Sequence, residues 1–239
     1  MSCFESEIWM NFLKKSKEKF DNSNIKITNT HDKEIILIEP KDDTIMCEYV
    51  IKNAMYFLHE DWNLTIMHGK KNEQHFKNIT KNLGDVKLIN LNIDTFRPFP
   101  YAYNKFLTSE KFHNLIEKNI FLIIQLDVLI LKKIPDMFFQ YSYVGAPWKR
   151  NWGVPCGNGG FSLRNKTDML KIIKKYKWEE LHEDVWFSKK CVLLNLNICP
   201  KKIASLFSSE TIFNENSCGL HKPRFGLDKL KLIIDKVQW

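Results

Sequence analysis

An acidic residue interrupts a strongly apolar stretch near the middle of the chain. Residues 121–131 read FLIIQLDVLIL, so Asp127 lies between two segments with the composition of buried strands. Because burying an unpaired carboxylate costs several kcal/mol, Asp127 needs a cation or strong hydrogen-bond donors beside it. One interpretation is an aspartate that only caps the turn after a strand. The sharper hypothesis is a ligand for a metal ion or a ribose at the edge of a sheet.

A glycine cluster follows further along the chain. Gly157, Gly159 and Gly160 are three of only nine glycines in 239 residues, and they lie in the string CGNGGFSLR. Glycine tolerates positive φ and lets a ligand approach the backbone closely. The string matches neither a Walker A loop nor the dinucleotide-binding fingerprint. A structural tight turn is the alternative interpretation.

Two further strings carry groups that can exchange protons or hold charge. Glu183 and Asp184 open a predicted helix, where they either favour the positive end of its dipole or supply a general base. His221 lies in the string CGLHKP, just before Lys222. A histidine at this point is an ordinary polar residue, a metal ligand or a contact to a pyrophosphate.

The elements that must position these groups follow from the apolar patterns. In the first half, predicted strands over 34–39, 62–67, 86–91 and 120–126 alternate with predicted helices over 42–59, 72–82 and 104–119. This alternation predicts an α/β fold, with a mostly parallel central sheet and helices on both faces. Ligands then bind beyond the carboxyl ends of the strands, where Glu39, His68 and Asp127 lie.

The second half of the chain is less regular. Short predicted strands over 143–146, 160–163 and 203–207 mix with predicted helices over 166–177 and 183–190, which indicates a smaller mixed C-terminal part. The first 20 residues have the pattern of an amphipathic helix. We therefore expect a helical extension over 1–30 beside a single domain over 31–239.

Charge and cysteine usage narrow the classes of partner and compartment. The net charge of +8 permits an anionic partner, but the lysines are scattered in pairs and form no basic stripe, so nucleic acid is not the expected partner. The six cysteines contain no C-x-x-C pair, which argues against a zinc knuckle. Three disulfides stay arithmetically possible. With no signal peptide and no apolar run of membrane-spanning length, we expect a soluble protein in the reducing cytoplasm.

Taken together, these strings resemble the GT-A nucleotide-sugar glycosyltransferases. The glycine-rich segment that ends in SLR, followed by Glu-Asp-Val at 183–185, is similar to the β1,3-galactosyltransferase and Fringe-like enzymes. A closer resemblance is to a GT-A-like family formerly of unknown function, found in bacteria, fungi and large DNA viruses; for a viral member the compartment would be the host cytoplasm. It covers about residues 34–225, and its motifs lie at 38–40, 68–72, 103–109, 125–127, 143–148, 157–164, 183–188, 204–210 and 219–221.

The resemblance implies an activity and a role for each matching residue. The activity is that of a hexosyltransferase, which moves a sugar, most simply from a UDP-sugar, to a hydroxyl of a glycan, protein or small molecule with inversion. Asp184, or Glu183 as second choice, would be the catalytic base. Asp127 and His221 would hold Mn²⁺ or Mg²⁺. The donor would contact Glu39, His68, Asn72, Asn104, Gln125, Trp148, Asn158, Gly159, Gly160 and Lys222.

One departure from the family pattern keeps an alternative function open. Related transferases carry Asp-x-Asp where this chain has Gln125-x-Asp127. A neutral amide oxygen binds a dication less tightly than a carboxylate does. The alternative is therefore a catalytically degenerate GT-A fold that binds a nucleotide or a glycan, and a nucleic-acid-binding protein is a more distant one.

Overall fold

Four parallel strands make up one side of the larger of two sheets. The computed structural model describes residues 3–41 and 45–239. In it β1 (Lys33–Glu39), β2 (Trp62–His68), β3 (Val86–Asn90) and β4 (Ile120–Ile124) pair in the order β3-β2-β1-β4. Nearly every residue of β1, β2 and β4 is buried, as expected of parallel strands that are covered on both faces. The predicted α/β fold with a mostly parallel sheet is confirmed.

Two antiparallel strands and a small second sheet complete the β structure. β7 (Phe161–Asn165) runs antiparallel to β4, and β6 (Tyr143–Gly145) runs antiparallel to β7. The second sheet has the order β5-β9-β8, from β5 (Val128–Ile130), β9 (Gly219–His221) and β8 (Ser208–Ser209). Val128 pairs with His221, so the turn between β4 and β5 meets the end of β9.

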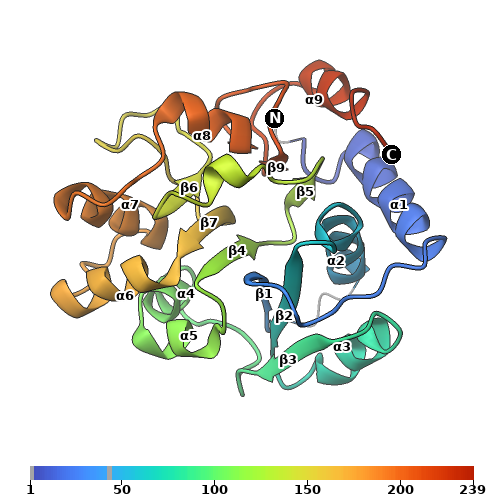
Figure 1. Ribbon diagram of the computed structural model, residues 1–239, viewed down its shortest axis with the longest axis horizontal. Helices are drawn as coiled ribbons and strands as arrows, with labels where there is room; N and C mark the ends of the chain where they lie inside the picture. The colour runs from blue at the N-terminus through green and yellow to red at the C-terminus, as the bar shows by residue number, and fades with distance from the viewer. Residues whose placement is uncertain (1–2, 42–44) are drawn as a thin grey trace.

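The helices form a layer on each face of the larger sheet (Figure 1). One layer holds α1 (Glu7–Asp21), α2 (Ile45–Leu58) and α3 (Glu73–Thr80). The other holds α4 (Tyr101–Leu107), α5 (Glu110–Leu115), α6 (Lys166–Lys175) and α7 (Glu183–Leu193). This division follows from right-handed crossovers, because the chain moves outward from β1 to β3 and then returns to β4 on the other side of β1. The strand order therefore reverses between β1 and β4.

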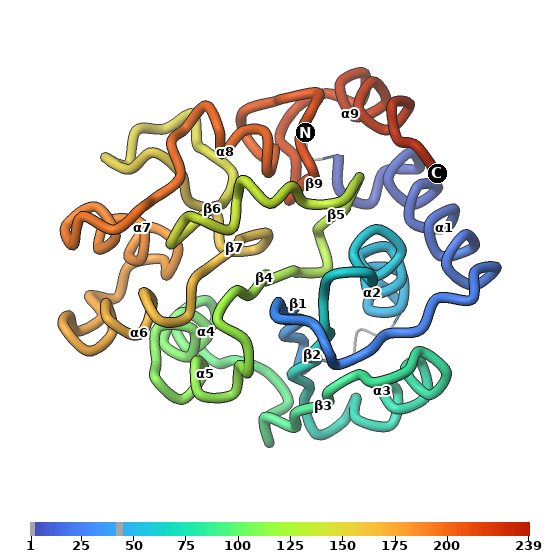
Figure 2. Tube along the Cα trace, in the orientation of Figure 1, coloured from blue at the N-terminus to red at the C-terminus, as the bar shows by residue number. Residues whose placement is uncertain are grey.

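The helices nearest the two ends of the chain pack together on the outside of the first layer. The trace in Figure 2 brings the blue α1 beside the red α9 (Leu227–Ile234). Trp9, Phe12 and Leu13 of α1 are buried with Leu230 and Ile233 of α9 in a small core of their own. The amphipathic helix predicted near the N-terminus is present as α1.

Two predicted elements differ from the structure. Residues 203–207, predicted as a strand, belong to α8 (Lys201–Phe207), whose buried residues Ala204 and Phe207 are three apart as on one face of a helix. The helix predicted over 104–119 is two helices, because Ser109 accepts a hydrogen bond from the backbone of Phe112 and so begins α5. The other predicted bounds agree to within a few residues, and the start predicted at residue 42 lies outside the described residues. A 3₁₀ turn, η1 (Asp136–Phe138), joins β5 to β6.

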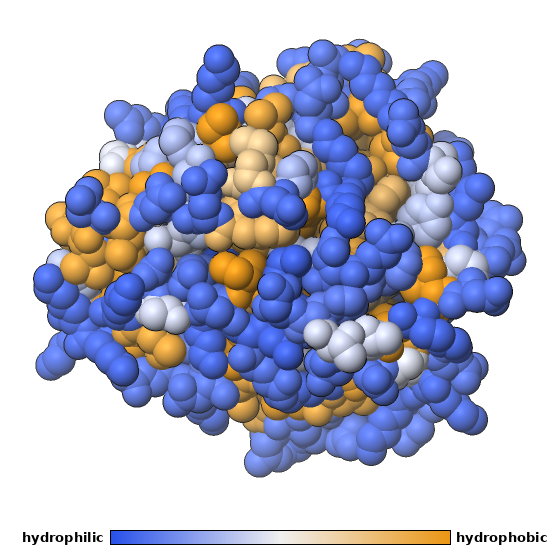
Figure 3. Space-filling view, in the orientation of Figure 1, coloured by the Kyte–Doolittle hydropathy of each residue, from blue (hydrophilic) through white to orange (hydrophobic). Residues whose placement is uncertain are grey.

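The face shown in Figure 3 is mostly polar, and the cysteines lie inside the protein. Hydrophilic residues cover most of the face in Figure 3, with an apolar patch over α7, where Val192 and Leu193 are exposed. All six cysteines are buried thiols. Across the described residues, no helix is both long enough and apolar enough to cross a bilayer.

Candidate active site

Asp127 lies in the turn that links β4 to β5, at the carboxyl end of the sheet. Its Oδ1 is 3.1 Å from Nε2 of His221, and its carbonyl oxygen accepts a hydrogen bond from the backbone of Lys222 at 2.9 Å. Burial by itself would raise the pKa of Asp127. The close contact with His221 and the positive charge of Lys222 outweigh burial, so the pKa of Asp127 is lower than usual. Asp127 is therefore an anion that this site stabilises.

Gln125 connects this pair to a buried tyrosine. Its Oε1 is 3.3 Å from Nε2 of His221, and its Nε2 donates to the hydroxyl of Tyr103 at 3.0 Å. Burial raises the pKa of Tyr103 well above its usual value, so this hydroxyl stays protonated. Tyr103 begins the motif at 103–109, and its place beside Gln125 shows that α4 reaches the site.

Asn158 fixes the shape of the glycine turn and the orientation of the histidine. Its Oδ1 accepts from the backbone nitrogens of Gly160 and Phe161, at 3.1 and 3.2 Å, while its Nδ2 lies 2.6 Å from Nδ1 of His221. Because the two backbone donors hold Oδ1, the Nδ2 group must donate to Nδ1 of His221. The proton of the neutral imidazole then lies on Nε2, which is 3.3 Å from its hydrogen-bond partner Oε1 of Gln125 and 3.1 Å from Oδ1 of Asp127.

The glycines of this segment allow the turn and also leave room for side chains that pack directly against the backbone. A Cβ added to Gly160 would lie 2.1 Å from Nε2 of His221, and one added to Gly159 would lie 1.9 Å from Oε1 of Glu183. One added to Gly157 would lie 1.8 Å from the ring of Trp148. Side chains would therefore displace the surrounding groups, which explains why glycines cluster in this segment.

The neighbouring acids Glu183 and Asp184 have different surroundings. Glu183 is buried in a bidentate ion pair with the fully buried Arg164, with N–O distances of 2.8 and 2.9 Å. The half-buried Asp184 accepts a hydrogen bond from the backbone of Gly159 at 3.1 Å. Burial, and then the charge of Glu183, raise the pKa of Asp184 to about 6. Sequence reasoning missed the pairing of Arg164, because it joins positions that only the fold brings together.

A cavity of about 280 Å³ opens beside these groups, at the carboxyl ends of β1 and β4. The strand order reverses at this point, which is where open α/β sheets bind ligands. Glu39, Gln125 and Asp127 line the cavity, as do two residues that sequence reasoning missed, Phe96 and Phe99. The aromatic and proline-rich string FRPFP at 96–100, just after β3, was the available signal.

Some predicted site residues lie apart from the cavity. Asn72 accepts a hydrogen bond from the backbone of Gly69 and donates to the carbonyl oxygens of Glu39 and Lys41. His68 contacts the carbonyl oxygen of Gly69 at 2.7 Å. Both therefore fasten the loops that hold Glu39 in place. Among the described residues, the cavity wall includes neither of them. Of the predicted site residues that the structure describes, only Glu39, Gln125 and Asp127 line it, and Gln125 and Asp127 connect it to the others that lie behind it. The other predicted residues outside the wall are Asn104, Trp148, Asn158, Gly159, Gly160, Glu183, Asp184, His221 and Lys222.

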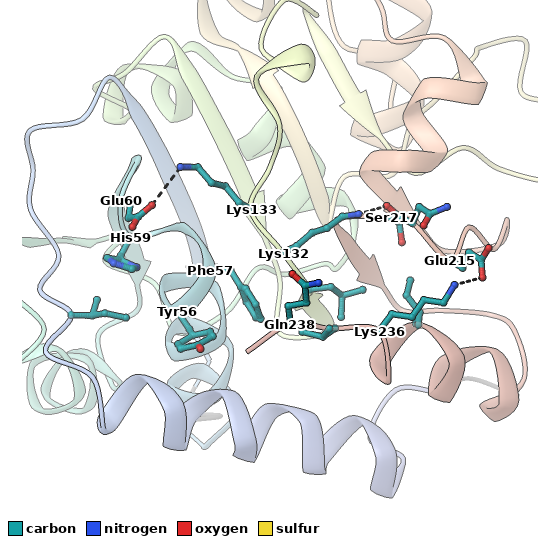
Figure 4. Close-up of a pocket in the computed structure, with 15 residues that line it drawn as sticks. Tyr56, Phe57, His59, Glu60, Lys132, Lys133, Glu215, Ser217, Lys236 and Gln238 are labelled. Carbon is teal, nitrogen blue, oxygen red and sulfur yellow. Dashed lines mark hydrogen bonds and ion pairs between the residues drawn. The ribbon is translucent and has the colours of Figure 1, made fainter.

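A larger cavity, of about 660 Å³, lies elsewhere and includes no predicted site residue among its described lining (Figure 4). It is bounded by the end of α2, by residues 131–133 and 215–217, and by the C-terminal segment. Each of its lysines already has an acceptor: Lys132 the carbonyl oxygen of Asn216, Lys133 the carboxylates of Glu60 and Asp61, and Lys236 that of Glu215. The smaller cavity is the candidate active site because the polar network converges there.

The comparisons with known proteins agree with this architecture. A sequence profile of a family described as proteins of unknown function, DUF5672, matches residues 85–221, more than half of the chain. The chain belongs to this family. Within the match lie Gln125, Asp127, the glycine turn, Asp184 and His221. No curated protein sequence matches the chain.

Solved structures show that this DUF5672 chain has a glycosyltransferase fold. It is similar to the mannosyltransferase PcManGT from Pyrobaculum calidifontis in complex with GDP-Man and Mn²⁺, with a TM-score of 0.51, 7% identity and coverage of 82% of this chain and 63% of that chain. The apo-form glycosyltransferase GlyE in Streptococcus pneumoniae TIGR4 gives a TM-score of 0.50, 12% identity and coverage of 84% and 60%. The chain thus spans less than two thirds of the length of either protein. The GT-A-like prediction is confirmed for the fold, and the relation to Fringe-like enzymes stays a prediction.

Proposed function

We propose that the chain is a glycosyltransferase that moves a sugar from a UDP-sugar to a hydroxyl acceptor with inversion. The observation that carries the proposal is the convergence of Asp127, Gln125, His221 and the glycine turn beside a cavity at the strand reversal. A general base, Asp184, is hydrogen-bonded to the same turn. The fold shared with PcManGT and GlyE supports the reaction class.

The leaving diphosphate needs charge stabilisation, and Lys222, His221 and a cation-binding pair of oxygens could supply it. Lys222 is exposed beside Asp127, and Nε2 of His221 lies 3.1 Å from Oδ1 of the same aspartate. The carboxylate of Asp127 and the amide oxygen of Gln125 fit a hard divalent cation, Mn²⁺ or Mg²⁺, which proteins often hold by one carboxylate together with substrate phosphates. Such a cation, when bound, offsets the charge of the diphosphate.

His221 fits this site better as a donor than as a metal ligand. A ligating imidazole needs a lone pair on the nitrogen that faces the metal and a proton on the other nitrogen. In this chain Nδ1 faces the Nδ2 donor of Asn158, at 2.6 Å. We therefore propose that His221 orients the amide of Gln125 through a hydrogen bond and supports the nearby carboxylate of Asp127 by its proximity, and the metal-ligand role stays a prediction of the sequence alone.

The sugar would lie against the glycine turn, near the half-buried Trp148, with Asp184 on the acceptor side. A base with a pKa of about 6 is mostly ionised at neutral pH and is still basic enough to take a proton from a hydroxyl in the transition state. Glu183 is the weaker candidate because both of its oxygens contact Arg164. Its proposed part is to hold the start of α7, and with it Asp184, in place.

Calorimetry with UDP, with and without Mn²⁺, followed by turnover of a panel of UDP-sugars, tests the proposal. We expect UDP to bind, the Asp127→Asn variant to bind it more weakly, and the Asp184→Asn variant to bind it normally but to lose transfer. Binding of UDP without any turnover would indicate the degenerate binding module instead. The proposal is wrong if the intact chain binds no sugar nucleotide.

A further inference from the structure

One wall of the candidate donor cavity comes from the very start of the described chain. Phe4 and Glu5 line the cavity together with Leu126 and Asp127. The family profile begins only at residue 85, so this wall lies outside the matched part of the chain. The sequence alone predicts only a helical extension over 1–30 beside the domain and assigns no site residue to it.

Contacts on both sides hold this wall in place. The backbone of Cys3 donates to the carbonyl oxygen of Pro223 at 3.3 Å, and its thiol donates to that of Phe225 at 2.6 Å. On the other side, the hydroxyl of Ser6 accepts from the backbone of Trp9 and begins α1. Phe4 and Glu5 therefore lie between two fixed points, and this segment is a built part of the cavity.

The Phe4 ring is also held by its own packing. It makes an edge-to-face contact with the fully buried Trp9, with ring centroids 5.6 Å apart and an interplanar angle of 82°. Such a contact limits the positions that the half-buried Phe4 ring can take. The ring is thus pre-positioned for a ligand in the cavity.

The lining of the cavity indicates which part of a nucleotide sugar it takes. The aromatic rings are Phe4, Phe96, Phe99 and Tyr103, and the charged groups are Glu5, Glu39, Asp127 and Lys41. Three carboxylates against one ammonium disfavour a diphosphate inside the cavity but suit the N–H and O–H donors of a nucleoside. Aromatic rings suit a planar base, which can stack on them.

Resting on the proposed function, we propose that Phe4 and Glu5 bind the nucleoside half of the donor. Phe4 contacts the base, and the exposed Glu5 accepts a hydrogen bond from a hydroxyl or N–H group of the nucleoside. The loop that fastens Cys3 directly follows Lys222, the residue proposed for the diphosphate. The two halves of the donor site are thus joined through residues 222–225.

A binding experiment separates the two halves of the donor. The affinity for UDP is measured by calorimetry, and that for inorganic pyrophosphate by competition with UDP, for the wild-type chain and for Phe4→Ala, Phe4→Leu and Glu5→Gln. Glu7→Gln is the matched control, since Glu7 lies two residues on, in the first turn of α1, and does not line the cavity. Loss of one aromatic contact to a base should weaken UDP binding roughly tenfold in Phe4→Ala.

The expected pattern is specific to a nucleoside contact. Phe4→Ala and, less strongly, Glu5→Gln weaken UDP binding and leave pyrophosphate binding unchanged, while Glu7→Gln changes neither. If Phe4→Ala lowers the midpoint of thermal unfolding, the binding of UDP and pyrophosphate is compared in Phe4→Leu instead, because leucine keeps an apolar side chain against Trp9. Equal loss for UDP and pyrophosphate, or no loss in folded variants of a chain that binds UDP, overturns the inference alone. A wild-type chain that binds no sugar nucleotide overturns the proposed function first.

Discussion

The raised pKa of Asp184 leads to a quantitative prediction about the pH dependence of transfer. With a pKa of about 6, Asp184 is about 90% ionised at pH 7 and about 10% at pH 5. Since only the ionised carboxylate can accept a proton, kcat/KM should fall roughly tenfold between these two pH values. With the ordinary value of 3.8, the carboxylate would still be about 90% ionised at pH 5, and the rate would hardly change.

The assay is release of UDP from a donor and acceptor pair at pH 5, 6, 7 and 8, at constant ionic strength. Asp184→Asn should lower kcat by roughly 10²- to 10⁴-fold at pH 7, the usual contribution of a general base, without weakening UDP binding. Asp228→Asn, at an exposed aspartate that begins α9, is the matched control and should keep both the rate and the profile. A flat profile between pH 5 and pH 7, or an Asp184→Asn variant with full activity, would refute the reasoning.

Three further predictions concern the surroundings of the site. Arg164→Met should lower the free energy of unfolding by about 3–5 kcal/mol in urea titrations, because it leaves a carboxylate buried without its partner, and a loss below about 1 kcal/mol would contradict the buried ion pair. Gly160→Ala should weaken UDP binding because the new Cβ meets His221, whereas Gly226→Ala, where the Cβ meets nothing within 4 Å, should not; equal effects would argue against close contact at the turn. Nitrogen NMR should find the proton of His221 on Nε2 in the wild type and an added proton on Nδ1 in Asn158→Asp, where a carboxylate would face each nitrogen, and an Nδ1–H tautomer in the wild type would disprove the orientation set by Asn158.

The sheet and the place of the site could be predicted because both follow from local patterns. Buried parallel strands are continuous apolar runs, and their carboxyl ends meet at one edge, so Glu39 and Asp127 had to lie near each other. The short run at 203–207 was misread because five residues with several apolar members fit a strand as well as a helix. Only its packing, with Ala204 and Phe207 buried on one side, distinguishes the two.

The contacts that tune the site could not be predicted, because they join distant parts of the sequence. Arg164 meets Glu183 from a different element, and nothing in the sequence of either string specifies the other. The same is true of Phe4, which reaches the cavity only because Cys3 is fastened to residues 223–225. Side-chain roles that depend on tertiary contacts of this kind need the fold, whereas residue types at strand ends do not.

The two acids that open α7 illustrate how surroundings divide chemical roles between adjacent residues. Successive positions at a helix start point in different directions, so Glu183 faces Arg164 while Asp184 faces the backbone of Gly159. The first acid has a full positive partner in direct contact, and the second has the backbone donors of Gly159 and Val185 and a negative neighbour. A carboxylate with a strong cationic partner is a poor proton acceptor, and one that is partly buried without such a partner is a better one. If Asp184 is the base, Arg164 therefore serves catalysis indirectly, because it neutralises the neighbour that would otherwise raise the pKa of Asp184 still further.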